Sequence, residues 1–276
     1  MSRPSIRHSA TLIAGCVTAG LIALLALVSL LWVPYAPDDT SGGRLAGPGE
    51  GHLLGTDKLG RDLFTQLMTG SRIAFEAGLG SVLIAAAIGV TLGVLAAFTR
   101  GWLDDTLSAL LDILIAFPTL LLAMLVVATR SATLASAVLA IGLAQSAVVG
   151  RLVRILVKRV LTQDYITAAR TSGTSWPRIV AGHVLPNIWP TLMVNLALQF
   201  GLAILAEAGL SYLGLGAPPP NASWGRMLQE AQATFTTAPA GALAPGILLV
   251  LLVIGVNLIA DGLRDTLDPA ARGRRG

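Results

Sequence analysis

The chain has 276 residues, of which 54% are hydrophobic and only 12% charged, and its mean hydropathy is +0.74. This composition is too apolar for a soluble domain of this length and indicates a protein of the lipid bilayer. The formal net charge is +4, but the basic residues cluster at the ends of apolar segments and form no single stripe, which argues against nucleic acid binding. The single cysteine, Cys16, lies in the first apolar run and excludes a disulfide framework or a cluster of thiol metal ligands.

Six apolar stretches are long enough to cross a bilayer as helices. A core about 30 Å thick requires roughly 20 residues of helix, because backbone amides in lipid must be hydrogen-bonded within the segment. We place the six spans at Ala10 to Val33, Ile73 to Phe98, Ala109 to Val127, Leu134 to Leu152, Ile188 to Ala206 and Leu243 to Ala260. The first is predicted to be a retained anchor, because it is longer than a typical signal-peptide core and no small-residue cleavage site precedes Pro34.

The basic residues predict the orientation of these spans, since loops rich in arginine and lysine stay cytoplasmic. With both termini inside, 13 basic residues fall on the cytoplasmic side and 6 outside. We therefore expect cytoplasmic termini. The predicted organisation is an N-terminal tip with the first transmembrane helix (1–33), an extracytoplasmic loop (34–72), a transmembrane core (73–262) with a cytoplasmic loop at 162–187, and a cytoplasmic tail (263–276).

The polar segment 162–187 is unusual between two apolar spans. Its first part, "TQDYITAARTS", predicts a short helix outside the membrane, which Gly173 can end by adopting a left-handed conformation. A second helix can follow at once, because Ser175 suits an N-cap and Pro177 is tolerated in a first turn. We expect "LPN" at 185–187 to end this second helix and lead into the fifth span. From these residues alone, a basic connecting loop remains an alternative to a functional unit.

In this segment Ala168 and Ala169 are followed by Gly173 and then by Leu185 and Pro186. This spacing resembles the EAA loop of bacterial ABC-importer permeases, which forms a coupling helix that docks into a groove of the ATPase subunit. Thr167 replaces the usual glutamate, and His183 stands where isoleucine is usual, although histidine is normal in the peptide and nickel branch. The resemblance implies that the ATPase-coupling residues are Thr167, Ala168, Ala169, Arg170, Gly173, His183, Leu185 and Pro186.

Four further stretches, in the expected order, resemble the second-type permease subunit of the same branch. They are "HLLGTDKLGRDLFTQLMTGSR" (52–72), "LLDILIAFPTLLLA" (110–123), "ILAEAGLSYLGLGAPPPNASWGRML" (204–228) and "NLIADGLRDTLDP" (257–269). The resemblance implies an all-α membrane protein with about six transmembrane helices, in the type I ABC importer transmembrane fold with a cytoplasmic coupling helix. It also implies a location in the bacterial inner membrane.

The resemblance further implies the partners of the chain. These are a second homologous permease subunit, two ABC ATPase subunits and an extracytoplasmic substrate-binding protein, all working with the lipid bilayer and without nucleic acid. The chain itself is expected to bind no cofactor, because ATP and Mg belong to the ATPase subunits. Dipeptides or oligopeptides are the expected substrates, and nickel chelates or glutathione-like compounds remain open.

Other functions are less consistent with the residues. A P-loop needs a lysine between glycine and serine or threonine, and neither Lys58 nor Lys158 has such neighbours, so the chain is not expected to be an enzyme that hydrolyses ATP. The clearest intramembrane enzymes need a serine paired with histidine, or two aspartates, at the midplane, and all three histidines lie outside the spans. Three scattered histidines and one cysteine also make no tetrahedral metal site.

An ion-coupled secondary transporter is the main alternative, and it would need charge inside the membrane. The candidate carboxylates are Glu76, Asp112, Glu207 and Asp261, and each lies near an end of a predicted span. We therefore expect polar contacts for most of them. Asp112 and Glu207 are the candidates for a translocation pathway, with the Glu207 carboxylate placed to meet a substrate amine near the outer mouth.

Overall fold

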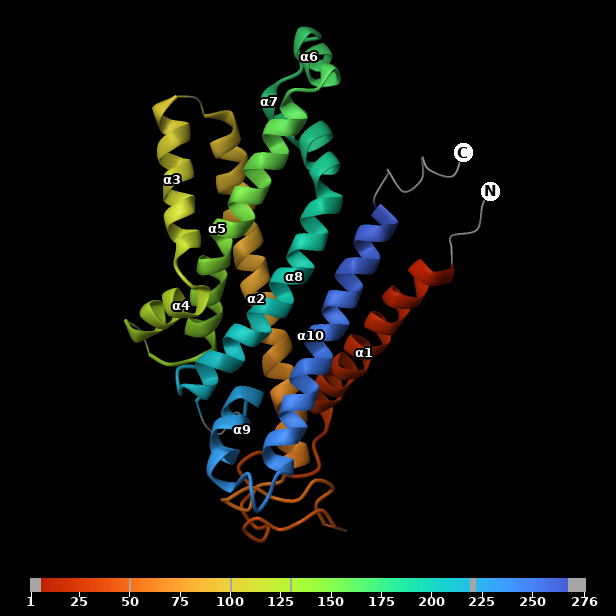
Figure 1. Cartoon of the computed structure of the whole chain (residues 1–276), viewed down its shortest axis with the longest axis vertical. Coiled ribbons are helices and arrows are strands. Elements are labelled where there is room, and N and C mark those ends of the chain that lie inside the picture. The colour runs from red at the N-terminus through yellow and green to blue at the C-terminus, as the bar shows by residue number, and fades with distance from the viewer. Residues whose placement is uncertain (1–5, 50, 100, 130, 219–221, 268–276) are drawn as a thin grey trace.

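The computed structural model describes residues 6–49, 51–99, 101–129, 131–218 and 222–267, and within these ranges it is almost entirely helical. The helices are α1 (Ile6–Leu31), α2 (Leu63–Phe98), α3 (Trp102–Ala116), α4 (Thr119–Ala128), α5 (Leu134–Leu161), α6 (Asp164–Thr171), α7 (Trp176–Ile179), a π-helix (Val180–Val184), α8 (Leu185–Tyr212), α9 (Trp224–Ala231), a 3-10 turn (Gln232–Thr234) and α10 (Ala240–Leu267). Figure 1 shows the long helices side by side, with α6 and α7 at one end of the bundle and α9 with the loop 34–62 at the other.

Among the described residues, five helical segments are long and apolar enough to cross a membrane: those containing α1, α2, α5, α8 and α10. The α3 and α4 pair supplies a sixth if it is counted as one span, so the prediction of about six transmembrane helices is confirmed. The span predicted over Ala109 to Val127 is not one continuous helix, because α3 and α4 meet at 90°. The cause is Pro118, which disfavours the helical conformation at Phe117, where φ is −79° and ψ is 132°.

The helices α2, α5, α8 and α10 are all longer than the spans predicted for them. α2 begins at Leu63, inside the region predicted as the extracytoplasmic loop 34–72, and the Asp62 side chain caps it by accepting a hydrogen bond from the backbone N–H of Thr65 at 2.7 Å. α5 continues past the predicted end at Leu152 to Leu161. Arginine and lysine are good helix formers, so the basic end of α5 stays helical although its hydropathy falls.

Close backbone contacts hold α2 against α5, because small residues let membrane helices pack closely. A Cβ atom on Gly93 would lie 2.5 Å from the carbonyl oxygen of Gly150, and one on Gly89 would lie 2.7 Å from that of Ser146. These distances are shorter than any ordinary contact of a side chain. The two helices therefore approach as closely as they do only because glycine occupies these positions.

This packing predicts that Gly93→Ala destabilises the protein by about 1 to 3 kcal/mol, because the added methyl group forces α2 and α5 apart. The matched control is Gly201→Ala in α8, where the nearest atom would be 3.8 Å from the new Cβ. There the gain in helix propensity should leave stability unchanged or higher. Thermal unfolding of the purified chain in detergent measures both. Equal melting temperatures for the two variants would contradict the close-packing argument.

The end of the molecule opposite α6 and α7 is a compact cap formed by the loop 34–62 and α9, and we call it the outer cap because it lies farthest from α6 (Figure 1). The Arg61 guanidinium bonds the Asp57 carboxylate at 2.7 Å and also pairs with Glu230 of α9. Trp224, at the start of α9, is 1% exposed, and its indole N–H donates to the carbonyl oxygen of Leu67 at 3.1 Å. Trp224 therefore lies inside the protein, because α9 folds back onto α2.

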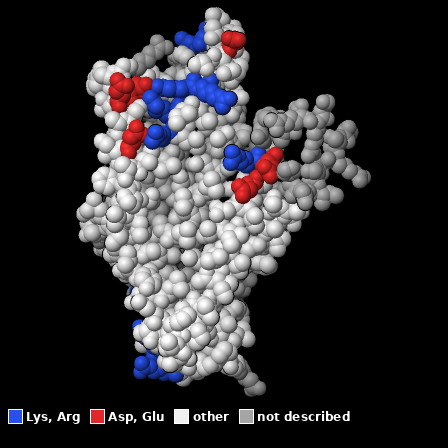
Figure 2. Space-filling model, in the orientation of Figure 1, with Lys and Arg blue, Asp and Glu red and all other residues white. Residues whose placement is uncertain are grey.

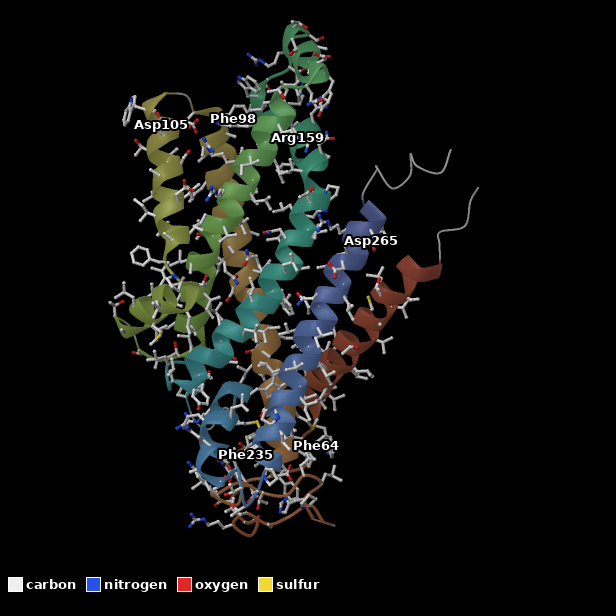
Figure 3. All side chains as sticks on the ribbon, viewed as in Figure 1. Phe64, Phe98, Asp105, Arg159, Phe235 and Asp265 are labelled. Carbon is white, nitrogen blue, oxygen red and sulfur yellow. The ribbon has the colours of Figure 1, made fainter. Side chains whose placement is uncertain are left out.

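Charged side chains gather towards the two ends of the molecule. On the face in Figure 2, a broad uncharged belt separates an upper group of acidic and basic residues from a lower basic group. Figure 3 places Asp105 and Arg159 near the α6 end, and Phe64 and Phe235 at the opposite end. This distribution fits a bundle whose middle lies in hydrocarbon and whose ends meet water.

Candidate functional site

The segment between α5 and α8 projects beyond the ends of the neighbouring helices (Figure 1). Its first helix, α6, spans Asp164–Thr171, close to the helix predicted over 162–172. Gly173 follows with φ of +80°. Its N–H donates to the carbonyl oxygen of Arg170, and the N–H of Thr174 donates to that of Ala169, both at 3.0 Å. This pair of bonds is the Schellman motif, which confirms the predicted left-handed helix end.

The second helix, α7, begins at Trp176 after Ser175 and has Pro177 in its first turn, as predicted. The predicted end at 185–187 is wrong, because the π-helix Val180–Val184 leads directly into α8. The N–H of Leu185 bonds the carbonyl oxygen of Val180, which is a wider turn than an α-helix makes. Pro186 then lies in the first turn of α8, where its missing N–H is tolerated and the chain stays helical.

The segment has a buried inner side and an exposed outer side. Ile166, Ile179 and Val184 are buried in a cluster that also contains Val157 of α5. Among the implied coupling residues, Ala169 and Leu185 are half-buried, and the exposed ones are Thr167, Ala168, Arg170, Gly173, His183 and Pro186. The fold thus brings all eight into one short unit and leaves most of them open to a partner.

Aromatic contacts brace this outer side. The Arg170 guanidinium lies over the Trp176 ring, 4.3 Å from its centre, and also donates to the carbonyl oxygen of Thr174 at 3.3 Å. Trp176 packs edge-on against Phe98 at the end of α2, with ring centres 5.0 Å apart. Sequence reasoning missed Trp176, whose only signal is an aromatic residue placed soon after Arg170. The brace fixes the angle between α6 and α7.

The two pathway candidates lie in different surroundings. Asp112 of α3 forms an ion pair with Arg151 of α5, with 2.9 Å between Oδ1 and Nη1, and both side chains are about half exposed. Glu207 of α8 is only 2% exposed and accepts a hydrogen bond from the Ser211 hydroxyl at 2.5 Å. Its carboxylate therefore lies inside the protein and not at an open outer mouth.

The other two predicted carboxylates also lie on membrane helices. Glu76 pairs with Arg72 one turn earlier in α2 at 2.7 Å. Asp261 is exposed near the end of α10. Contacts between neighbouring polar groups, as expected from the sequence, are therefore observed for Asp112, Glu207 and Glu76.

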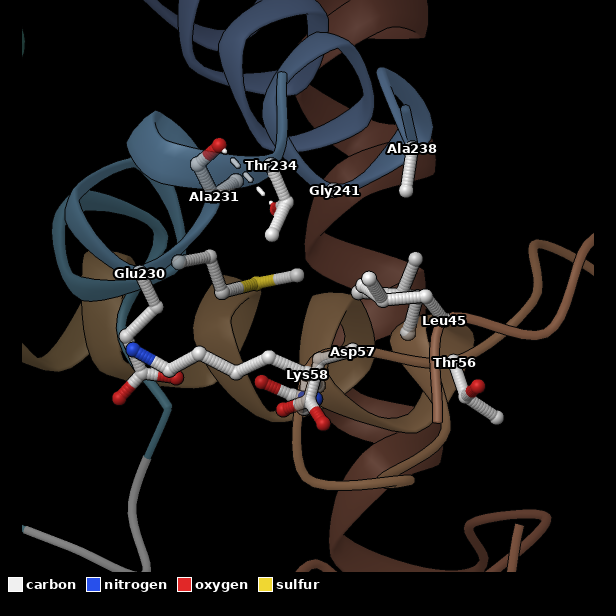
Figure 4. Close-up of a pocket in the computed structure, with 12 residues that line it drawn as sticks. Leu45, Thr56, Asp57, Lys58, Glu230, Ala231, Thr234, Ala238 and Gly241 are labelled. Atoms are coloured by element: carbon white, nitrogen blue, oxygen red, sulfur yellow. Dashed lines mark hydrogen bonds between the residues drawn. The ribbon is translucent and has the colours of Figure 1, made fainter. Parts of the chain in front are cut away.

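A small pocket lies in the outer cap, between the loop 34–62 and α9 with the start of α10 (Figure 4). Its lining includes Asp57, Gln66, Met227 and Glu230. The cavity measures about 20 Å³, which is room for about one water molecule. It is too small for a peptide, so it is no substrate site.

Comparison with known proteins identifies the family to which this chain belongs. The model of the "Binding-protein-dependent transport system inner membrane component" family matches residues 89–273, which include α6, α7 and the helices on both sides of them. The chain belongs to this family. It is thus a multi-pass inner-membrane permease subunit of an ABC importer, with a role in transport.

Relatives of this permease agree with the assignment. It is 41% identical to the glutathione transport system permease protein GsiD of Pectobacterium atrosepticum, over 92% of the chain and 86% of the relative. It is also 41% identical to the dipeptide transport system permease protein DppC of Alkalihalophilus pseudofirmus, over 85% of the chain and 77% of the relative.

Solved structures share the fold of this permease. A chain of the MetNI methionine ABC transporter, in an inward-facing conformation, superposes with a TM-score of 0.60 at 20% identity and covers 72% of this permease and 94% of that chain. A second crystal form gives 0.62 at 19% identity, over 74% and 96%. These matches confirm the predicted ABC importer transmembrane fold.

Proposed function

We propose that this permease forms half of the translocation pathway of an ATP-driven importer for dipeptides or oligopeptides, and that the segment 162–187 couples it to an ABC ATPase. The observation that carries the proposal is the exposed, internally braced unit of α6 and α7 at the end of the bundle. Because α5 leads into α6, and α7 continues through the π-helix into α8, a force applied to this unit reaches two membrane helices directly.

Each coupling residue has a role in this proposal. The small side chain of Ala168 lets the ATPase approach α6 closely. Gly173 sets the turn between the two helices. Arg170 keeps its cation–π contact with Trp176 and presents a charge on the outer side, and His183 lies near Tyr165, with ring centres 6.2 Å apart. Thr167 offers the ATPase a hydroxyl where the family usually has a carboxylate.

The remaining coupling residues support the unit from within. Ala169 is half-buried and its carbonyl oxygen accepts the bond that closes the Schellman motif. Leu185 and Pro186 join the π-helix to α8, so the unit and the membrane helix move as one body. Binding energy from the ATPase then acts on the orientation of α8.

The partners are a second homologous permease, two ABC ATPase subunits that carry ATP and Mg, and an extracytoplasmic binding protein. The α6 end faces the cytoplasm in this proposal, since Arg151, Arg154, Lys158 and Arg159 of α5 lie towards it. The described ends of α1 and α10, towards the two termini, lie in the same half of the molecule (Figure 1). This supports the part of the proposal in which both termini lie in the cytoplasm.

The names of the relatives support a peptide substrate. One relative is named for dipeptides and another for glutathione, which is itself a small peptide. Nickel chelates and glutathione-like compounds are the alternative cargoes. In each case the buried Glu207 and the paired Asp112 would meet substrate only after the helices around them move, which makes them candidates for the pathway in another conformation.

The test is purification of the tagged permease from its native membrane in mild detergent, with mass spectrometry of the proteins that accompany it. A second permease and ATPases with P-loops are expected. The complex, reconstituted in vesicles with its binding protein and ATP, should then take up labelled dipeptides in preference to glutathione or nickel chelates. Recovery of this chain alone, driving proton- or sodium-dependent uptake, would overturn the proposal.

A further inference from the structure

Helix α3 is weakly packed against the rest of the protein. Among its described residues only Leu111 is buried, and a methyl group of Leu111 lies next to Gly150 of α5. Trp102, Ile113 and Phe117 are each more than half exposed. Apolar burial within this chain therefore does little to fix the position of α3.

Ion pairs to α5 supply the missing attachment. At one end, Asp104 accepts bonds from Arg154 Nη2 at 2.6 Å and Nε at 3.0 Å, and it also pairs with Lys158. Two turns further along α3, Asp112 pairs with Arg151 at 2.9 Å. The two helices are antiparallel, so the acidic residues follow one another along α3 in the opposite direction to their partners along α5. Two sets of ion pairs therefore join the helices. We call them the α3–α5 ladder and each set a rung.

The ladder gives α5 a second attachment to the α3–α4 pair, beside the apolar packing of Ala123 and Val127 of α4 against Ile141 near the other end of α5. Its basic side belongs to α5, whose last residue, Leu161, is followed within three residues by α6. Its acidic side belongs to α3, which ends at the 90° bend before α4. An unpaired charge is costly next to lipid, so each rung favours staying closed while α5 moves.

We propose that the α3–α5 ladder transmits movement of α5, imposed at α6, to the Phe117–Pro118 bend and so to α4. Asp104, Asp112 and Arg151 are positioning residues in this device, and α4 is the element that it moves. The inference rests on the proposed coupling of α6 to an ATPase. It gives Asp112 a role through Arg151 that does not require contact with the substrate.

The test follows the position of α4 and needs no knowledge of the substrate. In a Cys16→Ser background, Leu121→Cys places one thiol on α4, at a side chain that is 57% exposed. The rate of its reaction with N-ethylmaleimide is measured in the purified complex, with and without a non-hydrolysable ATP analogue. We expect the nucleotide to change this rate by at least about five-fold, the lower range of coupling between distinct sites.

Charge reversal then tests the ladder itself. Asp112→Arg or Arg151→Asp alone should abolish the effect of nucleotide on labelling, and the two together should restore it, because the swapped pair re-forms the rung. Asp105→Arg, at an exposed acidic residue of the same helix, is the matched control and should keep the effect. If a reversed chain fails to assemble, Asp112→Asn carries the same test, since it removes the charge at nearly constant shape.

The outcomes separate this inference from the proposed function. Nucleotide-dependent labelling that survives both single reversals, or that the swap fails to restore, overturns the ladder. So does an unchanged labelling rate in a wild-type complex that contains the ATPases. A wild-type chain that purifies without any ATPase contradicts the proposed function instead, before any ladder variant is made.

Discussion

We expect Ala168→Trp to abolish most ATP-driven uptake by the assembled importer while leaving the permease folded. Ala168 is exposed on α6, and its carbonyl oxygen, not its side chain, accepts hydrogen bonds from the N–H and the hydroxyl of Ser172. The substitution should cost the permease itself no more than about 0.5 kcal/mol of helix propensity. A tryptophan forced into a closely packed interface costs about 1 to 3 kcal/mol, which corresponds to a roughly 5- to 150-fold weaker association.

Two controls make this result specific. Ala168→Ser keeps a small side chain and should retain both ATPase association and uptake. Ala132→Trp introduces the same bulk at an exposed residue just before α5, remote from α6, and should also be tolerated. The measurements are the amount of ATPase recovered with the tagged permease and the rate of uptake into vesicles. Normal recovery and uptake for Ala168→Trp would remove α6 from the coupling site.

The parts of the site that could be predicted from the sequence are those set by local rules. Gly173 ends α6 because a residue in the left-handed conformation closes the helix end, and glycine adopts that conformation readily. Pro177 marks the first turn of α7 because its missing N–H is tolerated there. The membrane helices follow from length and apolarity alone. The coupling role, by contrast, came from resemblance, because no physical rule turns a short exposed helix into a docking site.

The helix boundaries that were predicted wrongly are those that depend on proline, on backbone hydrogen bonds or on capping, which hydropathy does not describe. The bend before α4 has a visible signal in Phe117–Pro118, yet a window of apolar residues does not register it. The sequence did not predict that the helix continues through Val184 into α8, because a π-helix has no simple sequence pattern. The early start of α2 depends on a cap by Asp62, a polar residue that hydropathy assigns to the loop.

Contacts between distant parts of the chain could not be predicted at all. Arg61 and Glu230 are 169 positions apart, and Asp104 and Arg154 are 50 apart. Each pair depends on how whole helices pack. The sequence shows the charges but not their partners, which is why an importance for Asp112 could be suspected while Arg151 as its partner could not.

We expect Trp224→Ala to destabilise the outer cap by about 3 to 5 kcal/mol, the usual cost of removing a buried large aromatic side chain. The indole is 1% exposed and lies directly on Gly70 of α2, where an added Cβ would be 2.5 Å from Trp224 Cδ1. Its removal leaves a cavity between α9 and α2. The expected results are a lower melting temperature in detergent and faster proteolysis within the loop 34–62.

A graded series separates volume from hydrogen bonding at this position. Trp224→Phe keeps most of the ring but loses the N–H bond to Leu67, so it should cost only about 0.5 to 1.5 kcal/mol beyond the small change in volume. Trp189→Ala, at a tryptophan that is 55% exposed on α8, is the matched control and should change the melting temperature little. Equal losses at Trp189 and Trp224 would mean that α9 does not depend on the indole for its place on α2. A selective loss at Trp224 would show that one buried ring fixes the outer cap to the membrane helices.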